Sequence, residues 1–192
     1  MTLAQIMTLA LRQLDEDPED ISEYDDLFRV YANEGYRNAV AIYVRPRETR
    51  YARSDEHGLI MLEPDVRRVV ELKERLESGR GAQNSLLVLS ADGTALVTNL
   101  AYRDFILLCE VTAPDMEIET DEPTMLPKEA HNALADYICY RHLSNGNMAK
   151  QRKAQHYYQA YYQAMQRIRP QGTGSVKGYR NLYAATDIRN VR

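Results

Sequence analysis

The chain of 192 residues is 44% hydrophobic and 27% charged, with a formal net charge of -4. This length is enough for one compact domain with its own core, and the composition excludes disorder over most of the chain. The net charge argues against a protein that coats nucleic acid. No apolar run reaches the roughly 20 residues that a transmembrane helix needs, so we expect no membrane contact.

The charge is distributed unevenly along the chain. Residues 1–44 contain nine acidic and three basic residues, a net of -6, whereas residues 140–192 contain ten basic residues and one acidic residue, a net of +9. Such separation is typical of subunits that pack head to tail or against an acidic partner, although contact with nucleic acid also favours it.

The first residues predict two helices. Thr2 is suited to cap a helix that runs to Leu14, because apolar side chains recur at helical spacing after it. Asp17 and Pro18 end this helix, since proline disfavours helical geometry in the residue before it. A second amphipathic helix is expected from about Ser22 to Tyr43.

After Pro46 the chain changes to short segments with β-branched residues, which predict strands. Asp92 and Gly93 suit a tight hairpin turn. Residues 77–84 have no apolar side chain larger than alanine and are expected to form an exposed loop. The expected strands are Thr49–Ser54, Leu59–Leu62, Val66–Lys73, Ser85–Ser90, Thr94–Thr98 and Phe105–Thr112.

Helical periodicity returns after the acidic, proline-bearing stretch at residues 114–123. Pro127 suits the first position of a third helix, because it has no N–H group to leave unpaired. We expect this helix to stop at residues 144–146, with Gly146 in a left-handed cap. A fourth helix is predicted from Asn147 to Ile168.

The order of these elements predicts an α+β fold with a four-helix core, an inserted antiparallel β module and an extended carboxyl tail. Residues 1–45 and 114–169 would form the helical core, residues 46–113 the β module and residues 170–192 the tail. The tail has too little apolar surface to fold by itself, but its spaced apolar residues are suited to ordering on a partner. Its expected hinge consists of Gly172, Gly174 and Gly178.

No sequence pattern predicts a catalytic site, a metal site or a bound cofactor. Cys109 and Cys139 stand alone, so we expect two reduced thiols. The four histidines do not have the spacing of metal ligands. The glycines after Pro170 follow a helix and lack the Gly-Lys-Ser/Thr order of a phosphate-binding loop, and no G-x-S-x-G motif occurs.

Tyrosines recur in the fourth predicted helix. Their spacing of three and four residues indicates helix packing or a subunit interface rather than stacking on nucleic-acid bases. Glutamines fill much of the remaining helix surface. The tyrosines are Tyr157, Tyr158, Tyr161 and Tyr162.

Two segments resemble the closing helical pair of bacteriophage head–tail connector (adaptor) proteins. These segments are LPKEAHNALADYICYRHL at residues 126–143 and AQHYYQAYYQAM at residues 154–165. Residues 2–14 and 24–43 are similar to that family's opening helices, and the family carries a variable β insert between the two pairs. The resemblance covers most of residues 1–168.

The resemblance implies a structural virion protein that is not an enzyme. It implies a homo-oligomeric ring, usually of twelve copies, that connects the phage portal protein to tail or neck proteins, with nucleic acid at most passing through the lumen. The first residues lack the features of a secretion signal, so we expect the host cytoplasm during assembly and the head–tail interface of the virion afterwards. The candidate portal anchors are Tyr179, Arg180, Leu182, Tyr183, Ile188 and Arg189.

Three other functions compete with this interpretation. A head-closure or tail-completion protein of the phage neck is the nearest alternative. A nucleic-acid-associated protein would use the basic carboxyl end, and its affinity would fall steeply with salt. An enzyme would need the β insert to form a pocket with convergent polar groups.

Overall fold

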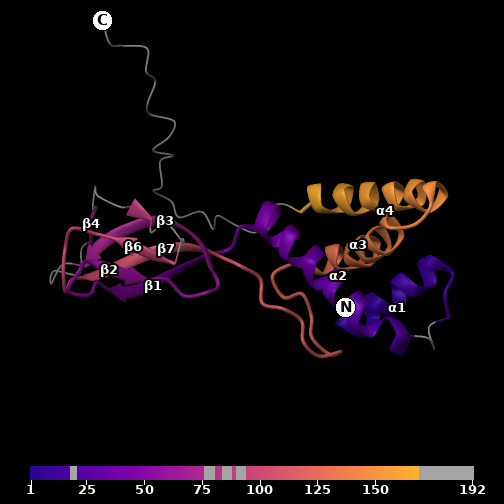
Figure 1. Ribbon diagram of the computed structural model, residues 1–192, viewed down its shortest axis with the longest axis horizontal. Coiled ribbons are helices and arrows are strands. Elements are labelled where there is room, and N and C mark those ends of the chain that lie inside the picture. The colour runs from indigo at the N-terminus through magenta and orange to yellow at the C-terminus, as the bar shows by residue number, and fades with distance from the viewer. Residues whose placement is uncertain (18–20, 76–80, 84–87, 90–93, 169–192) are drawn as a thin grey trace, which may run out of the picture.

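The computed structural model describes residues 1–17, 21–75, 81–83, 88–89 and 94–168, which form an α+β fold. The helices lie at one end of the molecule and the strands at the other (Figure 1). The helical elements are α1 (Leu3–Leu14), α2 (Ile21–Ala39), a π-helical turn (Val40–Val44), a 3-10 turn (Lys128–Ala130), α3 (His131–Ser144) and α4 (Met148–Gln166). The strands are β1 (Arg47–Arg53), β2 (Leu59–Met61), β3 (Val66–Arg75), β4 (Gly81–Gln83), β5 (Val88–Leu89), β6 (Ala95–Val97) and β7 (Asp104–Val111).

The first two helices follow the sequence prediction closely. Thr2 caps α1, because its Oγ1 accepts the Gln5 N–H at 3.4 Å while Gln5 Oε1 accepts the Thr2 N–H at 3.0 Å. The second helix has the predicted extent, but its last residues form the π-helical turn. This turn ends at Arg45, whose positive φ of 48° redirects the chain into Pro46 and β1.

The third helix begins one position later than predicted, because Pro127 has an extended backbone with ψ of 145° and the helical turn starts at Lys128. The predicted start of the fourth helix agrees with the structure to within one residue. Pro127 precedes the 3-10 turn that leads into α3. Asn147 caps α4, because its Oδ1 accepts the Lys150 N–H at 3.0 Å.

The expected left-handed cap at Gly146 is wrong. Among the glycines that the structure describes, Gly58 has a positive φ and Gly146 does not. The Gly146 N–H donates to the Leu143 carbonyl at 3.1 Å, and Asn145 ends α3 with φ of -90°. The cap of the next helix follows at once, so the short connection between α3 and α4 turns without a left-handed residue.

The strands form two antiparallel sheets, with the orders β1-β7-β3-β4 and β2-β6-β5. Each of the six predicted strands overlaps one of them. The loop predicted at residues 77–84 is wrong in part, because β4 pairs with β3 there. Ladder hydrogen bonds use backbone groups, so a segment without large side chains can still pair. The predicted turn at Asp92 and Gly93 lies outside the described residues.

The two sheets share one hydrophobic cluster. Phe105, Leu107 and Cys109 alternate along β7 and are fully or almost fully buried, as expected for a strand with one inward face. Ile60 of β2 and Leu96 of β6 join the same cluster from the second sheet. The strands therefore have a core of their own.

A second and larger hydrophobic cluster contains side chains from α1, α2, α3 and α4. Gly35 allows α2 to approach α3 closely, since a Cβ atom at this position would lie 2.8 Å from Cγ of Tyr137. Residues from both ends of the described chain meet in this cluster, whereas the strands come from the segment between them.

Candidate interaction surface

The outer face of α4 carries exposed tyrosines. Ala154, Tyr161 and Met165 are buried against the rest of the helical part, whereas Tyr158 is 40% exposed and Tyr162 is 45% exposed. The rings of Tyr158 and Tyr162 are stacked, with centroids 6.5 Å apart and planes at 20°. Two aromatic rings thus lie side by side on the surface, one helical turn apart.

These exposed rings belong to a larger cluster that continues into the core. The Tyr158 ring centroid lies 4.8 Å from that of Tyr140 on α3, which lies 5.7 Å from that of Tyr137. Tyr137 in turn lies 4.9 Å from Tyr161. Aromatic contacts at these distances hold the rings in place, so the Tyr158 ring is held by its contact with Tyr140. We call Tyr137, Tyr140, Tyr158, Tyr161 and Tyr162 the tyrosine cluster.

Two of the four α4 tyrosines, Tyr157 and Tyr161, donate hydrogen bonds from their hydroxyl groups to backbone carbonyls of other helices. The Tyr161 hydroxyl donates to the Gly35 carbonyl at 2.9 Å, and the Tyr157 hydroxyl donates to the Gln13 carbonyl at 2.6 Å. Burial raises the pKa of Tyr161 above its ordinary value, and it raises the pKa of Tyr157 for the same reason. Tyr157 and Tyr161 therefore join α4 to α1 and α2, while Tyr158 and Tyr162 face outward.

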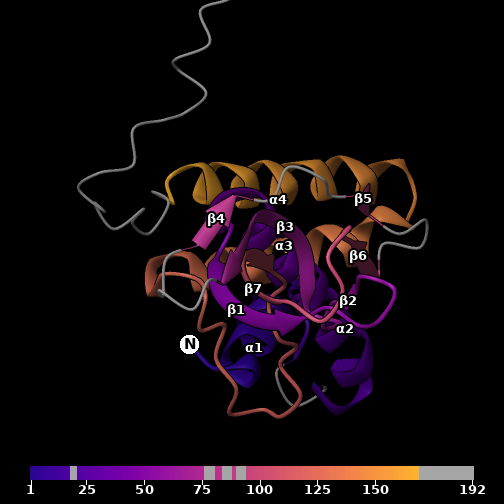
Figure 2. The same cartoon turned by 90° about the vertical axis from the view of Figure 1, so that its left-hand side faces the viewer.

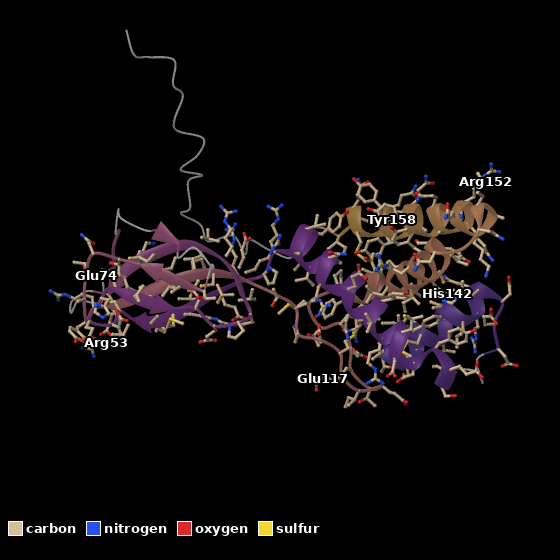
Figure 3. All side chains as sticks on the ribbon, viewed as in Figure 1. Arg53, Glu74, Glu117, His142, Arg152 and Tyr158 are labelled. Carbon is tan, nitrogen blue, oxygen red and sulfur yellow. The ribbon has the colours of Figure 1, made fainter. Side chains whose placement is uncertain are left out.

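The sequence of α4 contains basic residues and no acidic residue between positions 148 and 166. Arg152 is exposed near the amino-terminal end of the helix (Figure 3). Lys153 lies closer to α1, with its Nζ atom 3.6 Å from Asp15 Oδ2. The exposed residues of α4 thus include tyrosines, glutamines and basic residues.

A second prominent surface is the acidic loop, residues 115–122, which contains Asp115, Glu117, Glu119, Asp121 and Glu122. The Asp121 carboxylate accepts the N–H groups of Glu117 at 2.7 Å and Ile118 at 3.0 Å. This local bonding closes a tight turn. Ile118 stands on the turn with 60% of its surface exposed.

Long-range hydrogen bonds hold the acidic loop in position. The buried side chain of Asn33 on α2 donates to the Met116 carbonyl at 3.1 Å and accepts the Met116 N–H at 2.8 Å. At the start of α1, the Leu3 N–H donates to the Asp121 carbonyl at 2.7 Å and the Ala4 N–H to the Glu119 carbonyl at 3.1 Å. N–H groups that have no partner within α1 are satisfied in this way.

Sequence reasoning did not find this loop as a surface. The acidic, proline-bearing stretch at residues 114–123 has the sequence pattern of a solvated connection, because runs of carboxylates near proline are usually loops. The local signal was the position of Asp121, three and four residues after the two N–H groups that its side chain accepts. The partners on α1 and α2 are about 80 residues or more away in sequence, so no local pattern predicts them.

The chain matches no protein-family model and no curated protein. A functional assignment therefore depends on the residues themselves. No helix in the described part of the chain is long and apolar enough to cross a membrane. The predicted tail residues lie outside the described residues, namely the hinge Gly172, Gly174 and Gly178 and the anchors Tyr179, Arg180, Leu182, Tyr183, Ile188 and Arg189.

Both cysteines and one of the histidines are buried. Cys109 and Cys139 are both 0% exposed, and burial raises the pKa of Cys139 to about 12 and also raises that of Cys109. Both are therefore thiols at neutral pH, and a thiol is a poor nucleophile. His131 is also buried, with its Nε2 3.2 Å from the Leu126 carbonyl. Within the described ranges, no group of three or more His, Cys, Asp or Glu residues could hold a metal ion.

A charged cluster on the β strands is internally satisfied. The Arg50 guanidinium on β1 donates to Asp65 at 2.8 Å, to Glu48 at 3.0 Å and also to Glu63. The hydrogen bond from Arg50 lowers the pKa of Asp65. Because all three carboxylates bind the same guanidinium, this cluster joins β1 to the segment between β2 and β3.

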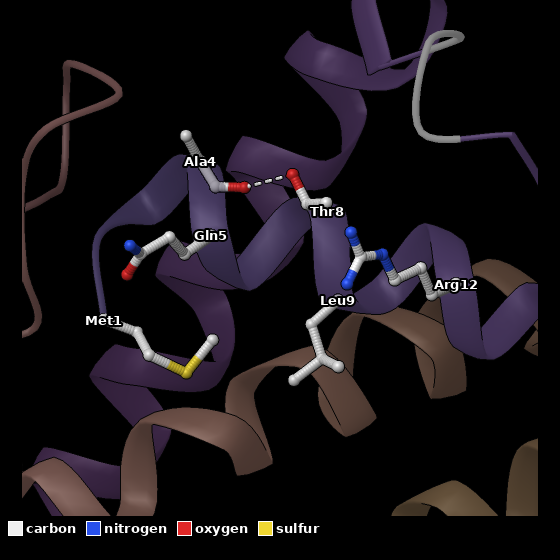
Figure 4. A pocket seen from close by; sticks show the side chains of 6 residues that line it. All are labelled: Met1, Ala4, Gln5, Thr8, Leu9 and Arg12. Carbon is white, nitrogen blue, oxygen red and sulfur yellow. Dashed lines mark hydrogen bonds between the residues drawn. The ribbon is translucent and has the colours of Figure 1, made fainter.

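Two depressions lie on the described surface of the helical part. One depression of about 450 Å³ lies along α1, and Arg12 is the one lining residue with a charged side chain (Figure 4). The hydroxyl of Thr8, which also lines this depression, donates a hydrogen bond to the Ala4 carbonyl at 2.8 Å. A second depression of about 370 Å³ lies beside the acidic loop and Arg29. Both depressions are open to solvent, which suits contact with other molecules better than enclosure of a small substrate.

Proposed function

We propose that the chain is a structural subunit of a bacteriophage head–tail adaptor, which acts by binding and performs no catalysis. The segments that resemble the adaptor family form α1, α2, α3 and α4. Side chains of these four helices share one hydrophobic cluster, which supports a four-helix core with residues 46–113 as an inserted β module. Such an arrangement agrees with the order of elements in the family.

The observation that carries the proposal is the exposed part of the tyrosine cluster. Tyr158 and Tyr162 stay on the surface although Tyr140 and Tyr161 support them from within the fold. Tyrosine is enriched in protein interfaces, because its ring provides large contact area and its hydroxyl stays hydrogen-bonded. In contrast, the described thiols are buried, which disfavours a reaction centre built on them.

The proposed role assigns different tasks to the parts of the chain. The helical core and the tyrosine cluster would form contacts between copies in a ring, usually of twelve in the family. Residues 179–189 would bind the portal protein, with residues 172–178 as the hinge. A closed ring binds a ring-shaped partner through many weak contacts at once, so each tail adds effective concentration for the next.

The test is a deletion of residues 172–192. We expect the shortened chain to remain folded, because its hydrophobic clusters lie within residues 1–168, and to lose attachment to the cognate portal protein. The matched control replaces residues 172–192 with a glycine-serine sequence of equal length, which separates the loss of anchors from the loss of length. Electron microscopy of the full-length chain mixed with portal should show a ring coaxial with the portal.

Two results would reject this proposal. Full attachment of the shortened chain would show that the tail is not needed for portal binding. Absence of a coaxial ring would rule out the adaptor role. A ring attached to the opposite end of a complete neck, away from the portal, would instead support a head-closure or tail-completion protein.

A nucleic-acid-associated protein is the second candidate, and one observation favours it. Helix α4 has basic residues and tyrosines without an acidic residue among them, and such surfaces bind single strands by stacking and phosphate contact. Binding of this kind would weaken steeply between about 50 and 200 mM salt. A DNA affinity with that salt dependence, lost in Tyr158→Ala, would favour this candidate.

A further inference from the structure

The helical part carries opposite charges on two opposite sides. Helix α4 lies along one side, and the segment with the acidic loop hangs from the other side in two perpendicular views (Figures 1 and 2). Side chains confirm this arrangement, since Arg152 and Tyr158 lie on one side and Glu117 on the other (Figure 3). One copy therefore cannot bring these two surfaces together, whereas two copies can.

The two surfaces are complementary in chemistry as well as charge. Ile118 projects from the acidic loop with 60% of its surface exposed, and Glu117 and Glu119 flank it in sequence and are exposed. On the other side, Tyr158 and Tyr162 present apolar ring surface, with Arg152 as an exposed cation on the same helix. An aliphatic side chain between two carboxylates thus matches a pair of rings on a helix that also exposes a guanidinium.

Both surfaces are held in shape before any contact forms. Asn33 and the first turn of α1 hold the acidic loop by hydrogen bonds, and Tyr140 supports the exposed ring of Tyr158. Contact between such surfaces loses little conformational entropy, which favours association.

We propose that the acidic loop of one copy docks on the Tyr158 and Tyr162 face of α4 in the next copy. This inference rests on the proposed ring-forming function and identifies the contact between neighbouring copies. Because the two faces differ, the contact is head to tail and leaves one face of each kind free at the ends of a pair. Addition of further copies then produces a ring when the rotation between neighbours closes.

A second copy fits the α4 face better than nucleic acid does. Lys153 is already near Asp15, and the exposed residues beside Tyr158 and Tyr162 include Gln155, Gln159 and other neutral amides. A row of phosphates would require several free cations along this face. Binding a single loop with two or three carboxylates requires fewer free cations.

The test reverses charges on each surface separately and then together. We expect Arg152→Glu to weaken self-association at least tenfold, and Glu117→Arg combined with Glu119→Arg to do the same, as measured by sedimentation over a range of concentrations. The chain with all three substitutions should regain association to within about threefold of the natural chain, because attraction is restored with opposite signs. Restoration by the combined variant excludes a trivial loss of folding.

Aromatic contact is tested by Tyr158→Ala, which should also weaken self-association at least tenfold. The matched control is Tyr102→Ala, which removes an exposed tyrosine from the β-strand end and should leave association unchanged. Circular dichroism of each variant checks that the helices remain intact.

Three results would overturn the inference: a natural chain that stays monomeric at all concentrations, association that is insensitive to the reversals, or DNA binding that depends on Arg152 and is unaffected by the loop variants. Portal attachment is measured in parallel. Portal attachment by variants that assemble normally would overturn this contact and leave the adaptor function intact. Self-association that follows the charge pattern without portal attachment would overturn the adaptor function and leave the contact intact.

Discussion

At the scale of single residues, the tyrosines of α4 differ in what their hydroxyl groups contact. The Tyr161 hydroxyl is buried and donates to the Gly35 carbonyl, whereas Tyr162, one position later, is 45% exposed. The spacing of the tyrosines predicts that a helix face packs, but it does not predict which hydroxyl finds a partner. The partner of Tyr161 is 126 residues away in sequence, so the contact depends on tertiary structure.

Removing the buried hydroxyl should destabilise the fold. We expect Tyr161→Phe to lower the free energy of unfolding by about 1 kcal/mol, because it leaves the Gly35 carbonyl without this donor. Tyr162→Phe, the matched control, should change it by less than about 0.5 kcal/mol, as is usual for exposed positions. Urea unfolding of both variants measures the difference, and equal effects would contradict the assigned roles.

Stability should also fall at alkaline pH. Burial raises the pKa of Tyr161 and Tyr137 above the ordinary value and that of Cys139 to about 12. In the unfolded chain these groups have pKa values of about 9 to 10, so the folded state holds their protons more tightly than the unfolded state does. Their contribution is complete below about pH 9 and is lost as pH rises toward the folded pKa values.

The measurement is urea unfolding at several pH values from 7 to 10.5, for the natural chain and for Tyr161→Phe. The free energy of unfolding of the natural chain should decrease above about pH 9, and the decrease should be smaller in the variant, which has lost one buried ionisable group. A constant or rising stability up to pH 10.5 would show that these groups do not titrate as their burial implies.

At the scale of elements, the helices could be predicted well and the acidic loop could not. Caps and periodic apolar residues are local, so the sequence predicts Thr2 as the cap of α1 correctly and the start of α4 to within one residue. The sequence of β4 lacks the large residues that a strand pattern needs. The strand forms because β3 offers backbone partners for pairing. The acidic loop depends on Asn33, which comes from a helix about 80 residues earlier.

The anchor of the acidic loop can be tested by Asn33→Ala. This change removes two hydrogen bonds to the backbone of Met116 in a buried place, so we expect the free energy of unfolding to fall by about 1 to 3 kcal/mol. Amide hydrogen exchange within residues 115–122 should accelerate more than exchange in α3. Asn38→Ala is the control, since Asn38 lies on the same helix, is exposed and donates from its Nδ2 to the Tyr137 hydroxyl at 3.2 Å.

The control variant should remain within about 1 kcal/mol of the natural chain and should leave exchange in the loop unchanged. If Asn33→Ala leaves both the stability and the loop exchange unchanged, Asn33 does not hold the loop.

At the scale of the whole molecule, the two ends of the described chain meet in one hydrophobic cluster while the strands between them form another. The order of helices and strands predicts the α+β class, because helical periodicity is interrupted by strand patterns over residues 46–113. The sequence also indicates separated charge. It does not predict that the acidic loop and α4 lie on opposite sides, since their separation in space depends on how α1, α2 and α3 pack between them.

The proposed adaptor role requires the chain to bind the portal ring through its surface, and the mass of the complex with portal measures this binding. Native mass spectrometry of the cognate portal ring mixed with excess chain should show added mass equal to one 22.1 kDa copy for each portal subunit. A portal ring that keeps its own mass, beside a free chain of 22.1 kDa, would rule out the proposed adaptor role.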